Sequence, residues 1–159
     1  MNTPLGDYLD ELKINKSRLA NITGITTDRI NALCHEDTAI HYTDEVFPII
    51  YVANYLSNIP ENKFNSTIER IYPRKTKNLL INKLHGLSPA AQLFGYYTFQ
   101  RKDVEIEAKI PAGKISKYMN DNNKKAPIEE VLNFVDSLGL DPLVTLKKYY
   151  GVIDVKSKI

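Results

Sequence analysis

The sequence predicts an all-α fold made of two similar units of about 70 residues, each with five helices. Apolar residues recur at the three- and four-residue spacing of amphipathic helices along most of the chain. Glycine, proline and polar clusters separate these segments at short intervals. The apolar pattern of the first half also returns in the second half after 85 residues, which predicts that the chain is a tandem repeat.

The composition is that of an ordinary globular protein, with 43% hydrophobic and 25% charged residues among 159. No apolar run approaches the roughly 18 residues that span a membrane, and Met1–Asp10 lacks a basic and apolar leader, so we expect a cytoplasmic protein without membrane contact. A single cysteine excludes an internal disulfide, and three scattered histidines offer no metal cluster. No carboxylate pair or phosphate-binding loop occurs at a useful spacing. We therefore expect neither catalysis nor a cofactor, a metal or a small-molecule ligand.

Five helical segments are expected in the first half. Thr43 followed by Asp44 and Glu45 is typical of a helix start, because a capping hydroxyl and acidic side chains both favour the free N–H groups of the first turn. Pro48 inside that helix predicts a kink or a later start, unless it falls within the first turn. The expected segments are Leu5–Lys13, Ser17–Thr23, Thr26–Glu36, a helix from Thr43 that Pro60 closes, and Phe64–Tyr72.

The segment KSRLANITGITTDRINAL, residues 16–33, predicts two short helices joined by a tight turn. Ala20 is small enough to let the second helix cross closely, and Gly24 permits a turn with positive φ. Thr26 can cap the second helix through its hydroxyl. This is the layout of a DNA-binding helix-turn-helix. The positions expected to face the core are Leu19, Ala20, Ile25, Ile30 and Leu33, and those expected to face outward are Thr27, Asp28, Asn31 and Ala32.

The basic, polar break at Pro73–Lys77 is the best candidate for a domain boundary. It predicts a first domain at 1–72, a basic linker with a short connecting helix at 73–87, and a second domain at 88–159. Ser88 and Pro89 form a good cap and first-turn pair for the next helix. The helices expected here are Leu79–Leu84, one from Ser88 to about Gln100, Asp103–Ile110, Lys114–Asn120, Pro127–Leu138, and one from Asp141 to near Gly151, followed by a frayed tail.

The internal repeat is ungapped, and its strongest support is the agreement in the order of the helical segments. Identities are few, but acids and apolar residues of the fourth helix also coincide, since Asp44–Phe47 matches Glu129–Leu132. Each half is therefore expected to hold one five-helix unit. The matched apolar pairs are Leu9 with Phe94, Leu12 with Tyr97, Leu19 with Val104, Ile25 with Ile110, Ile30 with Ile115 and Leu33 with Tyr118.

The formal net charge of +2 hides an uneven distribution along the chain. Residues 1–72 carry a net charge of −4, residues 73–89 carry +4 without an acid, and residues 90–159 carry +2. If DNA is the partner, counterion release favours contact through the basic segment and the second half.

Both halves resemble the phage Cro/repressor-type (XRE-type) helix-turn-helix domain, a bacterial lambda-repressor-like fold, and the resemblance covers nearly the whole chain. The first half matches in the turn, with Leu19–Ala20, Gly24–Thr26 and Ile30. The second half matches in its fourth helix, with Ala126–Leu132 and Leu138–Pro142. Its turn departs from the pattern, because Glu105 and Lys109 stand where a small residue and glycine are expected. Either this unit packs less closely, or the turn is made by Pro111, Ala112 and Gly113.

The resemblance implies that the third helix of each unit enters the major groove of DNA. Asn31 could then pair with adenine and Lys117 with guanine, whereas Asp28 would repel phosphate and accept only from a cytosine amine. The expected base-contacting residues are Thr27, Asp28 and Asn31 in the first unit and Gly113, Ser116, Lys117 and Asn120 in the second.

Phosphate contacts are expected from residues that flank these helices. Basic runs of this kind more often form solvated loops, so the linker and loop lysines are open to either interpretation. The expected residues are Lys16 and Ser17 in the first unit, Arg74 and Lys75 in the linker, and Arg101, Lys102, Lys114, Lys124 and Lys125 in the second unit.

The resulting hypothesis is a non-enzymatic, sequence-specific regulator of transcription that binds double-stranded DNA, with a homodimer as a further expected assembly. The alternative is a protein–protein adaptor or dimerisation module that keeps the fold without binding DNA, because the first half is acidic and the second turn departs from the pattern. A nucleophile–base pair of Cys34 and His35 is not expected, since adjacent helical residues point about 100° apart.

Overall fold

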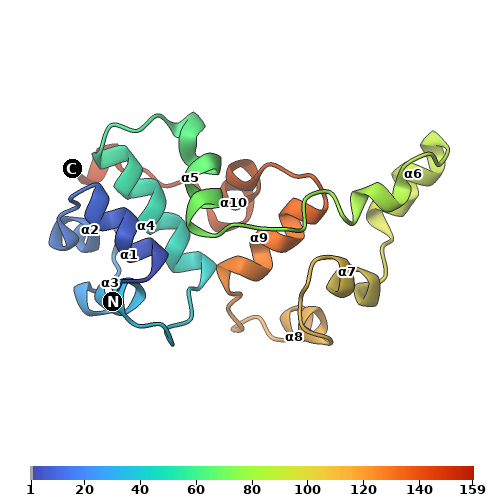
Figure 1. Ribbon diagram of the computed structural model, residues 1–159, viewed down its shortest axis with the longest axis horizontal. Helices are drawn as coiled ribbons and strands as arrows, with labels where there is room; N and C mark the ends of the chain where they lie inside the picture. Colours follow the sequence, from blue (N-terminus) through green and yellow to red (C-terminus); the bar gives the residue numbers. More distant parts are fainter. Residues whose placement is uncertain (1) are drawn as a thin grey trace. The chain divides into compact units, whose positions relative to one another are not determined.

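The computed structural model describes residues 2–159, and over this range the protein is all-helical without a β-strand, which confirms the predicted fold class (Figure 1). Its internal contacts divide the chain into two compact units. Unit 1 comprises the chain up to Pro73 together with Leu146–Ile159, and unit 2 comprises Arg74–Thr145. The C-terminal residues thus group with the first half, whereas the sequence pattern places them with the second.

Unit 1 begins with a run of five α-helices before Pro73. A short 3₁₀-helix, η1 (Glu61–Lys63), precedes the last of them, and a second, η3 (Lys156–Lys158), lies near the C-terminus. The helices are α1 (Pro4–Glu11), α2 (Lys16–Thr23), α3 (Thr27–His35), α4 (Thr43–Leu56) and α5 (Phe64–Ile71).

The core of unit 1 forms around α4, which contacts both α2 and α5. Phe47 of α4 is buried and meets the ring of Phe64 of α5 edge-on, with centroids 5.7 Å apart. α1 packs against α3 at Gly6, where an added Cβ would lie 2.3 Å from the carbonyl oxygen of Cys34. The hydroxyl of Thr3 donates to the carbonyl of Leu33 at 2.7 Å, which fixes the start of α1 on the end of α3.

The predicted turn between α2 and α3 is confirmed in its local chemistry. Gly24 ends α2 in the left-handed conformation, with φ +75°. Thr26 precedes α3, and its hydroxyl accepts from the backbone N–H of Arg29 at 3.1 Å. Leu19, Ile30 and Leu33 are buried, as predicted, whereas Ala20 and Ile25 are only half-buried.

The start of α4 differs from the expectation that Thr43 caps it. Tyr42 is the N-cap residue and makes no side-chain capping bond, while Thr43 is the first helical residue and is buried. Pro48 lies inside α4, which continues to Leu56. The helix therefore starts at the predicted place with a different cap, and Pro48 does not delay its start.

Unit 2 contains a 3₁₀-helix, η2 (Ile81–Leu84), and the helices α6 (Pro89–Tyr97), α7 (Arg101–Glu107), α8 (Lys114–Asn120) and α9 (Ile128–Ser137). The boundary with unit 1 falls inside α10 (Pro142–Tyr150). The core of unit 2 is small. Its buried residues Leu80, Val104 and Leu138 pack with the partly buried Tyr96, Phe99, Ile115, Phe134 and Leu140.

Two local arrangements recur at the 85-residue spacing of the repeat. Thr3 caps α1 ahead of Pro4, and Ser88 caps α6 ahead of Pro89, each hydroxyl oxygen accepting from a backbone N–H three residues later. The second recurrence joins the third and fourth helices of each unit, and it consists of the ion pairs Arg29–Glu45 and Lys114–Glu130. In both cases the two halves share an interaction as well as similar residue types.

Three expectations about packing are wrong. Leu93, Phe94 and Tyr97 of α6 do not enter the core, and Phe94 is 67% exposed while its repeat counterpart Leu9 is 1% exposed. The predicted linker packs into unit 2, where Thr76 is fully buried and its hydroxyl lies 3.1 Å from a carboxylate oxygen of Asp136. The C-terminal tail is not frayed, because Val155 is buried in unit 1.

Candidate nucleic-acid interface

The turn between α7 and α8 forms without the expected glycine. Lys109 takes the left-handed conformation at φ +54°, in the position that Gly24 holds in unit 1. Gly113 then has φ +79° and directly precedes α8, which begins at Lys114. An 85-residue shift of Thr27, the first residue of α3, would start this helix at Ala112. The turn of unit 2 is therefore two residues longer, and Pro111–Gly113 form its end.

Glu105 explains why this longer turn is stable. Its two carboxylate oxygens accept from the backbone N–H groups of Gly113 and Ile115, both at 3.0 Å. These hydrogen bonds lower the pKa of the Glu105 carboxyl below its usual range. The carboxylate thus supplies the capping acceptor that Gly113 lacks and joins α7 to α8. The resemblance implied that this position needs a small residue, and the structure shows a different solution.

The outward face of α8 gathers several of the predicted DNA-contacting residues. Ser116, Lys117, Asn120 and Lys124 line a shallow groove of about 370 Å³ together with Asp121. Arg101, at the start of α7, donates to the hydroxyl of Ser116 at 3.1 Å. Lys117, Asn120 and Lys124 are exposed. A guanidinium, two ammonium groups and an amide therefore meet on one face with a single carboxylate, that of Asp121, and this face can contact phosphates and base edges.

Lys114 is held beneath this face by Glu130. Its Nζ lies 3.2 Å from Oε2 of Glu130, while the phenol of Tyr118 donates to Oε1 at 2.7 Å. The ammonium groups of Lys114 and Lys124 lie 5.8 Å and 5.9 Å from the centre of the Tyr118 ring. Sequence reasoning missed Tyr118, which appeared only as an apolar match to Leu33. Lys114 is accordingly less available to phosphate than Lys117.

The corresponding face of unit 1 is less basic. Thr27 and Asp28 are exposed on α3, and Asn31 is half-buried. Lys16 lies at the start of α2 with its Nζ 3.2 Å from Nε2 of His35, and Ser17 beside it is exposed. The structure thus brings the predicted residues near the ends of α2 and α3, but with one ammonium and one carboxylate among them.

The remaining predicted residues differ in their availability. Lys75, Lys102 and Lys125 are exposed. Arg74 is not, because only 7% of its side-chain area is exposed and its Nε lies 3.6 Å from Oδ1 of Asp136. Contact of Arg74 with phosphate would require this ion pair to break, so its expected role as a phosphate contact does not fit the structure.

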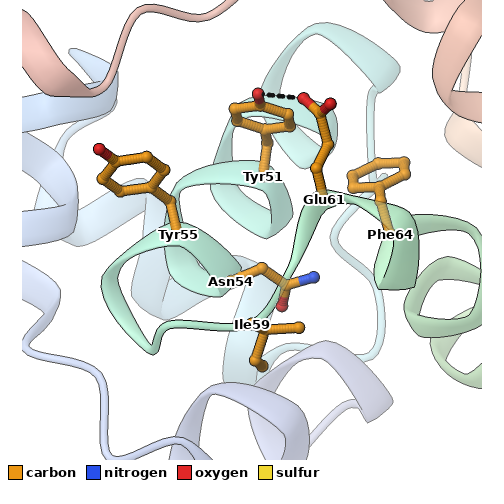
Figure 2. Close-up of a pocket in the computed structure, with 6 residues that line it drawn as sticks. All are labelled: Tyr51, Asn54, Tyr55, Ile59, Glu61 and Phe64. Carbon is orange, nitrogen blue, oxygen red and sulfur yellow. Dashed lines mark hydrogen bonds between the residues drawn. The ribbon is translucent and has the colours of Figure 1, made fainter.

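A second cavity, in unit 1, is too small for more than a water-sized ligand, at about 40 Å³ (Figure 2). The phenol of Tyr51 donates to Glu61 at 2.5 Å, and Lys147 also contacts Glu61. Burial and this carboxylate raise the pKa of the Tyr51 phenol to about 12. Asn54 is engaged by Tyr8 and by Thr67. The polar groups of this cavity therefore stabilise unit 1.

The chemistry of other reactive residues is limited. Cys34 is fully buried, and burial raises the pKa of its thiol. Among the described residues, no group of three or more His, Cys, Asp or Glu side chains is arranged to hold a metal ion. Within residues 2–159, no helix has both the length and the apolar character needed to cross a membrane.

Comparison of the chain with protein-family models, with characterised proteins and with solved structures gave no match.

Proposed function

We propose that the protein is a non-enzymatic, sequence-specific DNA-binding regulator of transcription, with α8 of unit 2 as its main DNA-contacting helix. The observation that carries the proposal is the exposed groove of α8, where Ser116, Lys117, Asn120 and Lys124 lie beside Arg101. The groove also contains Asp121, so three cationic side chains stand against one carboxylate. An ammonium can bond the O6 and N7 atoms of guanine, and an amide can pair with the edge of adenine. Lys117 and Asn120 are therefore the proposed base contacts, and Arg101, Lys102 and Lys124 the phosphate contacts.

The resemblance to phage Cro/repressor-type domains motivates this assignment, and the recurring interactions support the internal repeat that is part of it. Both units cap the first helix with a hydroxyl before proline and join the third and fourth helices by an ion pair. Unit 1 is the proposed weaker contact, through Thr27 and Asn31, because Asp28 repels phosphate. The proposal implies a bacterial or phage regulator that acts in the cytoplasm.

Fluorescence anisotropy with a pool of duplex DNA tests the proposal. The double variant Lys117→Ala, Lys124→Ala should weaken binding at least tenfold and reduce the slope of log K against log salt by about 1–2, because each released counterion adds nearly one unit. The matched control is Lys63→Ala, Lys148→Ala, which removes two exposed lysines of unit 1 and should change little.

The complementary pair Thr27→Ala, Asn31→Ala should weaken binding less than the α8 variant. The opposite ranking would make α3 the main contact. Negligible affinity of the wild-type chain at low salt, for every duplex pool tried, would overturn the DNA-binding proposal.

A protein–protein adaptor is the second candidate, and the exposed apolar side chains of α6 favour it. An adaptor would keep the helix-turn-helix fold while using this surface for a protein partner. The anisotropy experiment separates the two candidates, because an adaptor gains no salt-dependent affinity from Lys117 and Lys124.

A further inference from the structure

The α6 surface exposes apolar side chains that a helix of this pattern normally buries. Leu93, Phe94 and Tyr97 are 57%, 67% and 77% exposed. Leu87, just before α6, is also exposed. Within α6, all of which is described, no residue is buried. We call these four residues the α6 face.

The matching face of unit 1 shows what such side chains do when they are covered. Tyr8 and Leu9 of α1 stand 85 residues before Leu93 and Phe94, and both are buried. There, α1 packs against α3 and α5. In unit 2, α6 instead contacts η2. The same apolar pattern is thus core in one unit and surface in the other, so a folding role inside unit 2 does not account for it.

A groove lies directly beside the α6 face. It has a volume of about 650 Å³, and its apolar walls include Ile81, Leu84, Tyr96 and Leu138 together with Leu93 and Tyr97. Phe94 is not among the residues that line the groove. The polar side chains of Asn78, Asn82, His85 and Gln92 line the rest of the groove. Unit 2 therefore carries a projecting aromatic ring close to a partly apolar hollow, which α6, η2 and the segment after α9 form together.

The charge pattern favours a second copy of the same chain as the occupant. Leu87–Gln100 contains no Asp, Glu, Lys or Arg. In an isologous contact each residue faces the same surface of its partner, so like charges would meet, and an uncharged segment avoids this repulsion. A charged partner surface, by contrast, would meet no oppositely charged side chain in this segment. The projecting Phe94 and the adjacent groove supply the two complementary shapes that a two-fold contact needs.

The area available is also of the right order. A fully buried aromatic side chain contributes 150–250 Å², so Phe94 and Tyr97 at their observed exposure present roughly 250 Å² and the two leucines roughly 150 Å² more. Two copies would thus cover about 800 Å² of apolar surface. The uncharged polar rim, which includes Gln92 and His85, brings the total toward the roughly 1,200 Å² at the lower end of stable interfaces.

We propose that the α6 face and its groove form a two-fold interface between two copies of this chain, with Phe94 of each copy seated in the groove of the other. The proposal gives the expected homodimer a specific surface. It does not rest on DNA binding, and its test contains no DNA.

Sedimentation equilibrium of the purified full chain, from low micromolar to several hundred micromolar, tests the proposal. The wild type should show a reversible monomer–dimer equilibrium. Phe94→Glu should raise the dissociation constant at least tenfold, because it places a carboxylate in an apolar contact. The matched control is Val152→Glu, since Val152 is also an exposed apolar residue but lies in unit 1, and it should leave the dissociation constant unchanged.

A second variant and a second measurement keep the test independent of folding. Tyr97→Lys should weaken dimerisation in the same direction, and unchanged far-UV circular dichroism verifies that each variant is folded. Hydrogen exchange of wild-type α6 should slow as concentration rises. A wild-type chain that stays monomeric at all concentrations would overturn the proposal, as would a dimer that Phe94→Glu leaves intact. A monomer whose α6 face captures a different protein would also overturn it.

Discussion

Glu105 is the residue whose role differs most from the sequence-based expectation, and its effect can be measured. Glu105→Gln keeps the size of the side chain but removes the charge that two backbone N–H groups engage. We expect the variant to lower the thermal stability of unit 2, because charge-assisted capping bonds are stronger than neutral ones. The control is Glu129→Gln, which changes an exposed carboxylate of α9.

The same carboxylate predicts a pH dependence. The folded state lowers the pKa of Glu105, so its contribution to stability is fully present above the ordinary carboxyl pKa and is lost as pH falls through the lowered value. The difference in melting temperature between wild type and Glu105→Gln should therefore be largest near neutral pH and shrink in acid. A difference that stays constant down to pH 3 would contradict the proposed capping role.

Gly6 predicts a steric effect that a matched glycine does not share. A Cβ at Gly6 would lie 2.3 Å from the backbone oxygen of Cys34, so Gly6→Ala should destabilise unit 1 by about 1–3 kcal/mol. At Gly95 the nearest atom is Cδ2 of Leu84, at 2.6 Å, which belongs to a movable side chain. Gly95→Ala should therefore cost less, and chemical denaturation of the two variants would show the ranking. Equal costs would mean that the α1–α3 approach is adaptable.

Residues whose role depends on near neighbours in sequence were predictable, and those with remote partners were not. Gly24 and Thr26 act within one turn of the chain, so residue type alone indicates their geometry. Arg74 forms an ion pair with Asp136, which lies more than sixty residues later, and a run of basic residues does not indicate which acid it will contact. From the sequence, Glu105 was expected to prevent close helix packing. The N–H groups that donate to its carboxylate lie near Gly113, and they are placed there by a longer turn that residue type does not reveal.

At the scale of elements, the ion pair between third and fourth helices offers a direct comparison of the units. Arg29 contacts Glu45 through two nitrogens at 2.9 Å and donates to the carbonyl of Ile40, whereas Lys114 reaches Glu130 through one nitrogen at 3.2 Å. Double-mutant cycles with alanine should give a coupling of about 1 kcal/mol for Arg29–Glu45 and a smaller one for the lysine pair. A larger coupling in unit 2 would contradict this ranking.

Helix α6 shows what periodicity can and cannot predict. The spacing of Leu93, Phe94 and Tyr97 indicates a helix with an apolar face, and the helix forms. Periodicity does not say which element covers that face. In unit 1 the cover is α3 and α5, but the corresponding surroundings do not form in unit 2, so the face remains exposed. The candidate site on α8 was more predictable, because its residues are contiguous in one helix and the loop after it.

At the scale of the whole molecule, the assignment of the C-terminal residues to unit 1 predicts a contrast between two valines. Val155 is 2% exposed and Val152 is 76% exposed. Val155→Ala should cost about 2 kcal/mol of stability through lost burial and a residual cavity, and Val152→Ala less than about 0.5 kcal/mol. Urea unfolding of both variants would measure this contrast. Equal effects would mean that the tail is not part of the unit 1 core.

The fold class followed from the sequence, but the grouping of the helices did not. A shift of 85 residues aligns local patterns, and local patterns specify helices. Lys147 contacts Glu61, and Lys158 donates to the carbonyl of Ile22, at separations of 86 and 136 residues. Contacts at such separations leave no periodic trace, so the repeat alone could not assign the last residues to the first unit.

Because unit 1 includes the C-terminal residues, its core cannot be completed until synthesis of the chain ends. Translation proceeds from the N-terminus, so Arg74–Thr145 leaves the ribosome before Leu146–Ile159. The unit whose synthesis starts first therefore receives its last segment after all of unit 2 has been made. Until then the core of unit 1 lacks Val155, although α1–α5 have all been synthesised, whereas every residue of unit 2 is already present.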